Sequence, residues 1–281
     1  MIYMGMNRIL FVMWMAGMLL LSSCSLKEDR SGCPCWMAVE IPEQVGHDGG
    51  QVDNDDCVVL RLRGNSDEDE VGYSYQVTEA VKPDVGALEY EVPRGSVGVS
   101  VIGMPDRVGH DGIAEYDGDE IRIPVGEQMD SLYGFFRMFY TRCESLLCDV
   151  ELHKEFCTVS FTLGDDGYVS PYDLEVWGNV AGVSAWDLMP LEGDFRFTPS
   201  PEDGVYRVRV PRQFDASLEL VMLEDSKIVD RLPLGEYIAR SGYDWTAENL
   251  EDVHIALDLE NQQVMITVSG WDGVVVMDIV I

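Results

Sequence analysis

Apolar and polar side chains alternate through most of this chain. In residues 157–163 (CTVSFTL) the odd positions are apolar and the even positions carry hydroxyl groups. The same period of two recurs in residues 58–62, 97–101, 206–210, 253–259 and 264–268. A strand with one buried face has this period, because successive side chains point to opposite faces of the sheet. The pattern therefore predicts an all-β fold of short antiparallel strands packed as β-sandwiches.

One central segment departs from this alternation. Residues 128–148 carry large apolar side chains at roughly helical spacing, namely Leu132, Phe135, Phe136, Phe139 and Tyr140. This spacing predicts a helix near the middle of the chain, between two β domains. The boundary is expected within residues 143–154, which gives an N-terminal domain of residues 36–148 and a C-terminal domain of residues 149–281.

The N-terminus has the order of an export signal. Arg8 precedes an apolar run at residues 9–21, which ends in Leu21-Ser22-Ser23-Cys24. The run is shorter than the roughly 20 apolar residues that a membrane-spanning helix needs. Residues 1–23 are therefore predicted to be a signal peptide. The Leu-Ser-Ser-Cys ending resembles the bacterial lipobox, which implies acyl chains, including palmitate, on Cys24.

Two or more acyl chains hold a protein stably on a membrane, whereas one chain holds it only reversibly. Residues 24–35 would then be a lipidated tether. The alternative is an ordinary secretory signal in which Cys24 stands at the cleavage site by chance.

The charge of the chain excludes one class of partner. Lys and Arg number 19 against 51 Asp and Glu, for a net charge of −32. Such a surface repels the phosphates of nucleic acid, so we expect no nucleic-acid binding. The acidic runs at residues 53–56 and 66–70 lack the full spacing of a calcium loop and favour solvated turns.

Six cysteines remain besides Cys24, and they are Cys33, Cys35, Cys57, Cys143, Cys148 and Cys157. An even number in an exported protein is compatible with disulfides, but six thiols allow fifteen pairings, and the sequence does not choose among them. Buried reduced thiols are the equal alternative. Cys33 and Cys35 are separated by one residue, where zinc sites usually have two to four, so no metal site is predicted.

No catalytic motif is present. The chain has no Gly-x-Ser-x-Gly elbow, no glycine loop for phosphate and no His-Glu-x-x-His, so we predict neither an enzyme nor a cofactor. Trp177, Trp186 and Trp245 leave a second hypothesis open, a surface lipoprotein that binds glycans by stacking on tryptophan. Trp177 and Trp186 flank a Gly-Asn-Val-Ala-Gly segment, interpreted as a turn, which favours packing roles for both.

Several segments together resemble a known family. They are the lipobox with Glu28-Asp29 and Cys33-Pro34 behind it, Leu132-Tyr133-Gly134, residues 150–161, residues 233–238, and the strands of residues 252–268 followed by Trp271. They resemble the fimbrillin-associated anchor family, the minor subunits of type V pili. The resemblance implies two tandem transthyretin-like antiparallel β-sandwich domains. It also implies a lipid-anchored, surface-exposed accessory subunit on the cell outer membrane that attaches or terminates a fimbrium, supports cell adhesion and binds fimbrial stem subunits.

In that family, stem subunits lose their first strand to an Arg-specific protease and receive a strand from the next subunit, a form of β-strand complementation. Here no Lys or Arg stands between Arg30 and Arg61. The candidate first strand, residues 36–41, is therefore expected to stay in place. This retention suits an anchor or terminator better than a stem subunit.

The C-terminal segment is the candidate partner-binding strand. Its apolar residues are Val274, Val275, Val276, Met277, Ile279, Val280 and Ile281. A strand this apolar needs cover on both faces, because an exposed apolar edge invites aggregation. Two alternatives are open, donation to a partner or a central position in the chain's own second sandwich.

Overall fold

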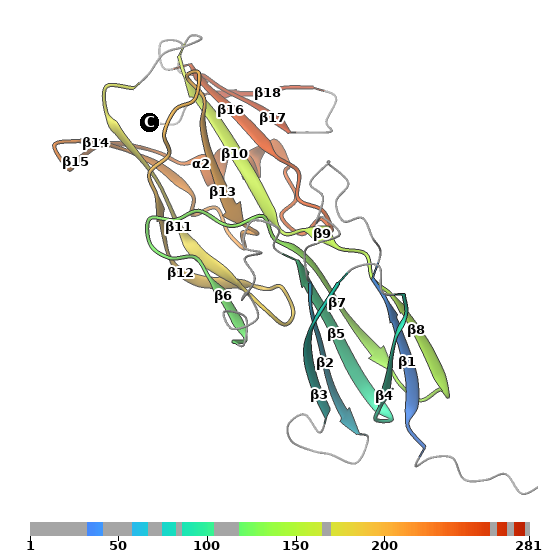
Figure 1. Cartoon of the computed structure of the whole chain (residues 1–281). Coiled ribbons are helices and arrows are strands. Elements are labelled where there is room, and N and C mark those ends of the chain that lie inside the picture. The colour runs from blue at the N-terminus through green and yellow to red at the C-terminus, as the bar shows by residue number, and fades with distance from the viewer. Residues whose placement is uncertain are drawn as a thin grey trace, which may run out of the picture. The chain divides into compact units, whose positions relative to one another are not determined.

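The computed structural model describes residues 33–41, 58–66, 75–82, 86–103, 118–164, 170–258, 263–268 and 273–278 (Figure 1). The predicted signal peptide, Cys24, Cys57, both acidic runs apart from Ser66, Trp271 and the last three residues lie outside this part. The chain divides into two units, residues 1–34 and residues 35–281. All the sheets belong to the second unit.

Two sheets come from the N-terminal half of that unit. The smaller has the order β4-β1-β8, formed by Leu88–Val92, Cys35–Glu40 and Ser145–Asp149. The larger has the order β3-β2-β5-β7-β9, formed by Tyr75–Val81, Val58–Ser66, Gly95–Gly103, Tyr133–Tyr140 and His153–Lys154. We call these the N-terminal sheets.

Two further sheets follow in the C-terminal half. The first has the order β13-β10-β16-β17-β18, formed by Tyr206–Pro211, Phe156–Leu163, Val253–Asp258, Gln263–Val268 and Val275–Asp278. The second has the order β12-β11-β14-β15, formed by Pro190–Phe197, Asp173–Ser184, Glu219–Glu224 and Lys227–Leu232, and β6 (Glu120–Arg122) also pairs with β11. We call these the C-terminal sheets. Helix α2 (Leu234–Ser241) is the one helix in the described ranges.

The alternating pattern produces these strands and their core. In β10 the side chains of Cys157, Val159, Phe161 and Leu163 are buried, while the hydroxyl residues between them are half-buried. Buried residues from all four sheets form one hydrophobic cluster. Most strand pairs are antiparallel, and the exceptions among the described pairs are β1 with β8 and β10 with β16. The prediction of an all-β sandwich fold is confirmed.

The predicted helix at residues 128–148 is wrong. The segment forms β7 and β8 instead. Apolar residues occur on both faces of β7, because Phe135 packs into the core while Phe136 contacts the Trp186 ring at a centroid distance of 5.4 Å. A strand covered on both faces loses its alternation, and its close-set aromatic residues then mimic helical spacing.

Two short strands connect the halves of the sequence. β6 precedes the predicted boundary but pairs with β11, and β9 follows the boundary but pairs with β7. The division into domains at residues 148 and 149 therefore stays a prediction.

The connection between β11 and β12 packs on the outer face of the larger N-terminal sheet. A Cβ added at Gly98 of β5 would lie 2.5 Å from the Trp186 ring, and one at Gly134 of β7 would lie 2.6 Å from Leu188. Glycine at both positions lets the β11–β12 connection approach the sheet closely. Trp186 is therefore a packing residue.

Polar groups complete the same contact. Arg61 of β2, which is buried, donates hydrogen bonds to the carbonyl oxygens of Gly118 at 3.0 Å and Ala185 at 3.3 Å. Ser100 of β5 donates to the Ala185 oxygen at 3.2 Å. Because buried polar groups need partners, these bonds make the position of the β11–β12 connection specific.

The turn predicted at Gly-Asn-Val-Ala-Gly is also wrong, since residues 178–182 lie inside β11. The pairing of β11 with β12 shifts register there twice. A Cβ at Gly182 would lie 2.2 Å from the Ile121 oxygen of β6, so the glycine permits a close approach of two backbones. Sequence pattern alone does not distinguish such a glycine-rich strand from a turn, because glycine occurs in both.

Candidate partner-binding surfaces

The predicted first strand is present as β1. It lies between β4, which runs antiparallel, and β8, which runs parallel. The Trp36 nitrogen donates to the Glu144 oxygen at 2.9 Å at one end, and the Val150 nitrogen donates to the Glu40 oxygen at 2.9 Å at the other. β1 thus fills the place between β4 and β8 along both of its edges.

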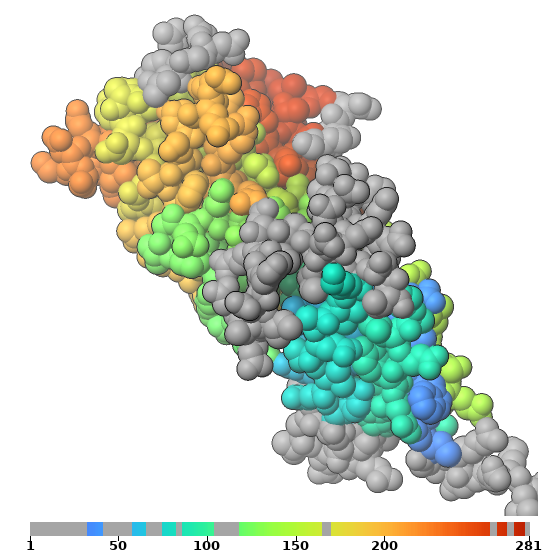
Figure 2. Space-filling model, in the orientation of Figure 1, coloured from blue at the N-terminus to red at the C-terminus, as the bar shows by residue number. Residues whose placement is uncertain are grey.

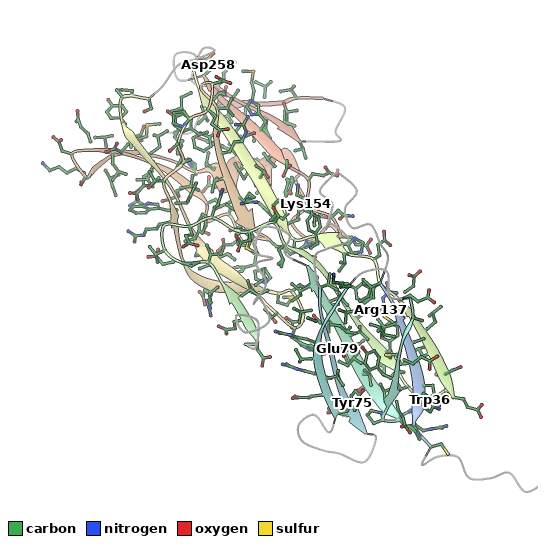
Figure 3. The ribbon with its side chains drawn as sticks, viewed as in Figure 1. Trp36, Tyr75, Glu79, Arg137, Lys154 and Asp258 are labelled. Carbon is green, nitrogen blue, oxygen red and sulfur yellow. The ribbon has the colours of Figure 1, made fainter. Side chains whose placement is uncertain are left out.

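The inward face of β1 belongs to the core. Cys35, Met37 and Val39 are buried, while Trp36 on the opposite face is 55% exposed (Figure 3). Removing β1 would expose the hydrophobic groove that these three side chains fill. Its retention after secretion stays a prediction.

The described part of the candidate partner-binding segment forms β18, at the edge of its sheet. β18 pairs with β17 in antiparallel register, with Ile266 opposite Val275 and Val264 opposite Met277. The order of the sheet places no further described strand beyond β18. The strand therefore lies in the chain's own sheet, but at its edge and not at its centre. Ile279, Val280 and Ile281 lie outside the described residues.

The outward face of β18 carries the apolar Val276 and, at the end of the strand, the charged Asp278. Val274 is 55% exposed and Val276 57% exposed, and Val276 pairs with Met265, which is 38% exposed. We call these three residues the edge patch. The strands that carry the patch lie at the surface in the space-filling view, where they are red (Figure 2). An apolar edge strand with free backbone groups is the usual template for adding another strand.

A cavity of about 790 Å³ is lined by residues from both halves of this unit. Its lining includes Phe136 and His153 from one half, and Asp187, Arg212 and Trp245 from the other. No motif in the sequence indicates this cavity, because its lining residues are far apart in the chain.

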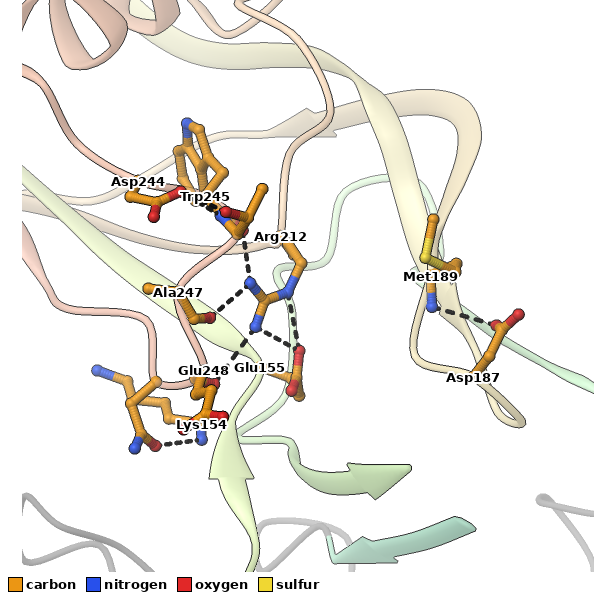
Figure 4. Close-up of polar contacts among 11 residues, drawn as sticks. Lys154, Glu155, Asp187, Met189, Arg212, Asp244, Trp245, Ala247 and Glu248 are labelled. Atoms are coloured by element: carbon orange, nitrogen blue, oxygen red, sulfur yellow. Dashed lines mark hydrogen bonds and ion pairs between the residues drawn. The ribbon is translucent and has the colours of Figure 1, made fainter. Parts of the chain in front are cut away.

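Arg212 organises one side of this cavity (Figure 4). Its guanidinium donates to the Glu155 carboxylate at 3.0 Å and to the backbone oxygens of Trp245 at 2.5 Å and Ala247 at 2.8 Å. Burial raises the pKa of Glu155, and the neighbouring Arg212 opposes that shift. The guanidinium is thus used to hold the loop after α2, so its contacts indicate a structural role.

The three tryptophans of the glycan hypothesis are half-buried, and their rings have side-chain neighbours. The guanidinium groups of Arg196 and Arg231 lie 4.3 and 5.0 Å from the Trp177 ring centroid. Trp245 contacts Tyr243 edge to face at 4.7 Å, and the Trp186 contacts are given above. At Trp177 and Trp186 these neighbours occupy ring surface that a sugar would need for stacking, whereas Trp245 also lines the cavity.

Within the described ranges, no group of three or more His, Cys, Asp or Glu side chains is placed to hold a metal ion. A helix with the length and hydrophobicity to cross a membrane is also not found among those residues.

Comparison with solved structures identifies the fold. A candidate polysaccharide-binding protein of Bacteroides thetaiotaomicron matches with a TM-score of 0.55 at 14% identity, over 87% of this chain and 98% of that one. The fimbrial anchor protein Mfa2 of Porphyromonas gingivalis matches with a TM-score of 0.53 at 10% identity, over 88% and 100%. A candidate adhesin of Bacteroides ovatus matches with a TM-score of 0.50 at 15% identity, over 89% and 97%.

No family model matches the sequence, and none of the curated proteins matches it either. The chain therefore has the fold of these solved proteins, which include fimbrial and adhesin-like proteins. At such low identities the similarity concerns the fold alone.

Proposed function

We propose that this chain is a lipid-anchored accessory subunit that attaches or terminates a type V fimbrium at the outer membrane and supports cell adhesion. Cys24 would carry the acyl chains, and the body of the protein would lie on the cell surface. The fimbrial stem subunits would be its partners. The fold it shares with a fimbrial anchor protein supports this assignment.

The position of β1 is the observation that carries the proposal. A stem subunit must offer an open groove to the strand of the next subunit, whereas here β1 fills that place and is bonded along both edges. No basic residue lies between Arg30 and Arg61, so an Arg- or Lys-specific protease has no site there. A subunit that keeps β1 accepts no strand at that place, which fits an end of the polymer.

The edge patch is the proposed contact with the stem. A strand from a fimbrial subunit would pair with β18 and cover Val274, Val276 and Met265. Backbone hydrogen bonds would supply affinity, and the alternating side chains would set the register. Donation of the C-terminal segment to the partner is the other form of strand complementation.

Truncation after Gly273 tests the contact. If the strand is donated or extended by a partner, the truncated chain should keep a cooperative thermal transition but no longer co-purify with fimbriae. Loss of the cooperative transition would instead show that β18 is needed for folding. A truncated chain that melts normally and still co-purifies would refute the role given to this segment.

Cys24→Ala tests the anchor. The variant should leave the membrane fraction and incorporate no labelled palmitate, while Cys33→Ser should behave as the unchanged chain. A Cys24→Ala chain that still takes up the label would contradict the lipid assignment.

Glycan binding is the second candidate function. A solved protein of this fold is described as a candidate polysaccharide-binding protein, and the cavity beside Trp245 offers a concave site. Trp245→Ala should weaken retention on a polysaccharide column under this hypothesis. If the Trp245→Ala variant is retained as strongly as the unchanged chain, the glycan-binding hypothesis at this cavity is wrong.

A further inference from the structure

We propose that Cys35 and Cys143 form a disulfide bond in the exported protein, which joins β1 covalently to the segment between β7 and β8. Their sulfur atoms lie 3.7 Å apart. Cys35 is the first residue of β1 and is fully buried, while Cys143 is exposed.

The backbone geometry suits this bond. The Trp36 nitrogen donates to the Glu144 oxygen at 2.9 Å, so the two cysteines stand at the same end of a parallel strand pair. Cys143 precedes β8 by two residues and lies beside the start of β1. A strand spacing of about 4.8 Å is compatible with the Cα separations that disulfides use. The sulfurs, 3.7 Å apart, would have to approach to a bond of about 2.05 Å.

The other buried thiols lack this arrangement. Cys148 and Cys157 lie inside β8 and β10, and burial raises the pKa of each thiol to about 12. The Tyr243 hydroxyl is hydrogen-bonded to Cys157. Among the pairings of Cys35, Cys143, Cys148 and Cys157, Cys35 with Cys143 is the one that the contacts in the described part of the chain favour.

The reaction needs an oxidant, and the proposal names a dithiol–disulfide oxidoreductase of the cell envelope. The exposed Cys143 thiolate attacks the disulfide of the oxidant, forms a mixed disulfide and displaces one of the oxidant's thiolates. The Cys35 thiolate then attacks the Cys143 sulfur, forms the new bond and releases the second thiolate. Two electrons and two protons pass from the cysteine pair to the oxidant, which becomes a dithiol.

Burial raises the pKa of the Cys35 thiol to about 11, and Cys143 adds to the shift while Arg94 opposes it. Cys35 is therefore poor at attacking an external disulfide but is held beside its partner for the second step. This order of events follows from the exposure of Cys143.

The bond would strengthen the retention of β1. After a cut anywhere between β1 and β2, the first strand would stay attached through Cys143. The inference rests on one part of the proposed function, namely export, because only an exported chain reaches the compartment that contains the oxidant.

Peptide mapping tests the bond. The exported full chain is purified without reductant, alkylated, and digested with trypsin and a Glu-specific protease. Cleavage after Arg30, Glu40, Arg142 and Glu144 should yield residues 31–40 linked to the dipeptide of residues 143–144. Because residues 31–40 also contain Cys33, the Cys33→Ser variant should keep the link and the Cys35→Ser variant should lose it.

A second measurement does not depend on peptide recovery. Adding dithiothreitol should lower the Tm of the unchanged chain by roughly 5 to 10 °C, because a long closed loop is opened. The Cys143→Ser variant should have the lower Tm from the start and should not respond to the reductant.

Alkylated Cys35 and Cys143 in the exported protein, or a link from Cys33 to Cys143, would overturn the inference. The result is separable from the fimbrial proposal. A chain that has the bond but does not co-purify with fimbriae refutes the fimbrial role alone, and a reduced chain that does co-purify refutes the bond alone.

Discussion

The N-terminal and C-terminal sheets repeat one strand order and differ at their edges. β1 and β10 each lie between an antiparallel neighbour (β4 or β13) and a parallel one (β8 or β16). In the larger N-terminal sheet β3-β2-β5-β7 corresponds to β12-β11-β14-β15. The smaller N-terminal sheet ends at β8, whereas its C-terminal counterpart continues past β16 with β17 and β18. Because of this added hairpin, β18 in the C-terminal segment is an edge strand of the sheet, and it carries exposed apolar residues.

The outer faces differ as well. The β11–β12 connection covers part of the N-terminal face, where Arg61 and Ser100 are buried and bonded to its backbone. In the C-terminal sheet, Trp177 of β11 lies between two exposed arginines. The same strand order therefore serves as a docking face in one half and as a solvated face in the other.

The largest expected effect compares the two first strands. Phe161→Ala in β10 removes a fully buried ring that stacks on Tyr206 at 5.2 Å, and should cost roughly 3 to 5 kcal/mol of unfolding free energy. Met37→Ala in β1 should cost less, about 2 to 3 kcal/mol, since methionine is smaller and adaptable. Urea denaturation measures both.

Thr162→Ala, on the half-buried face of β10, is the control and should cost below about 1 kcal/mol. A larger loss for Met37→Ala than for Phe161→Ala would show that the N-terminal sheets limit stability.

The second effect concerns the docking face. Arg61→Met removes two hydrogen bonds from a buried guanidinium and should cost about 2 to 3 kcal/mol. Arg207→Met is the control, because Arg207 on β13 is exposed and pairs with the exposed Glu202, and it should cost under about 1 kcal/mol. Equal losses in thermal denaturation would contradict a special role for the buried contact.

The third effect separates the two sheet edges. Leu147→Lys on β8 and Val276→Lys on β18 each replace an exposed apolar side chain, and each should change folding by about 0.5 kcal/mol or less. Co-purification with fimbriae should fall for Val276→Lys and stay unchanged for Leu147→Lys. The reverse result would move the partner contact to the N-terminal sheets.

The smallest effect compares the two parallel strand pairs. Where β1 and β8 set Ala38 opposite Leu147, β10 and β16 set Ser160 opposite His254. Burial, and secondarily Arg207, lowers the pKa of His254. The unfolded chain then binds the proton more readily, so this stabilisation is present above the ordinary pKa near 6.5 and is lost as the pH falls through the folded pKa.

His254→Asn should therefore reduce the loss of Tm between pH 7 and pH 5. The difference should be no more than about 2 °C, because the half-exposed ring is screened by solvent. An identical pH dependence in both proteins would show that other groups control acid stability.

Strand positions follow closely from the residue pattern. Alternation in residues 157–163 and 206–210 predicts β10 and β13, because each strand buries one face. The prediction fails at β7, whose first half is covered on both faces, and at residues 178–182, where glycines inside β11 look like a turn. In both places the contacts come from a segment distant in the sequence, so the local residue pattern does not indicate them.

The candidate site divides in the same way. The absence of basic residues between Arg30 and Arg61 and the apolar character of residues 274–277 are properties of the sequence. Tertiary structure decides that β1 lies between β4 and β8, that β18 is an edge strand, and that Cys35 meets Cys143. These contacts join residues that are up to a hundred or so positions apart, and chain folding, not local preference, brings them together.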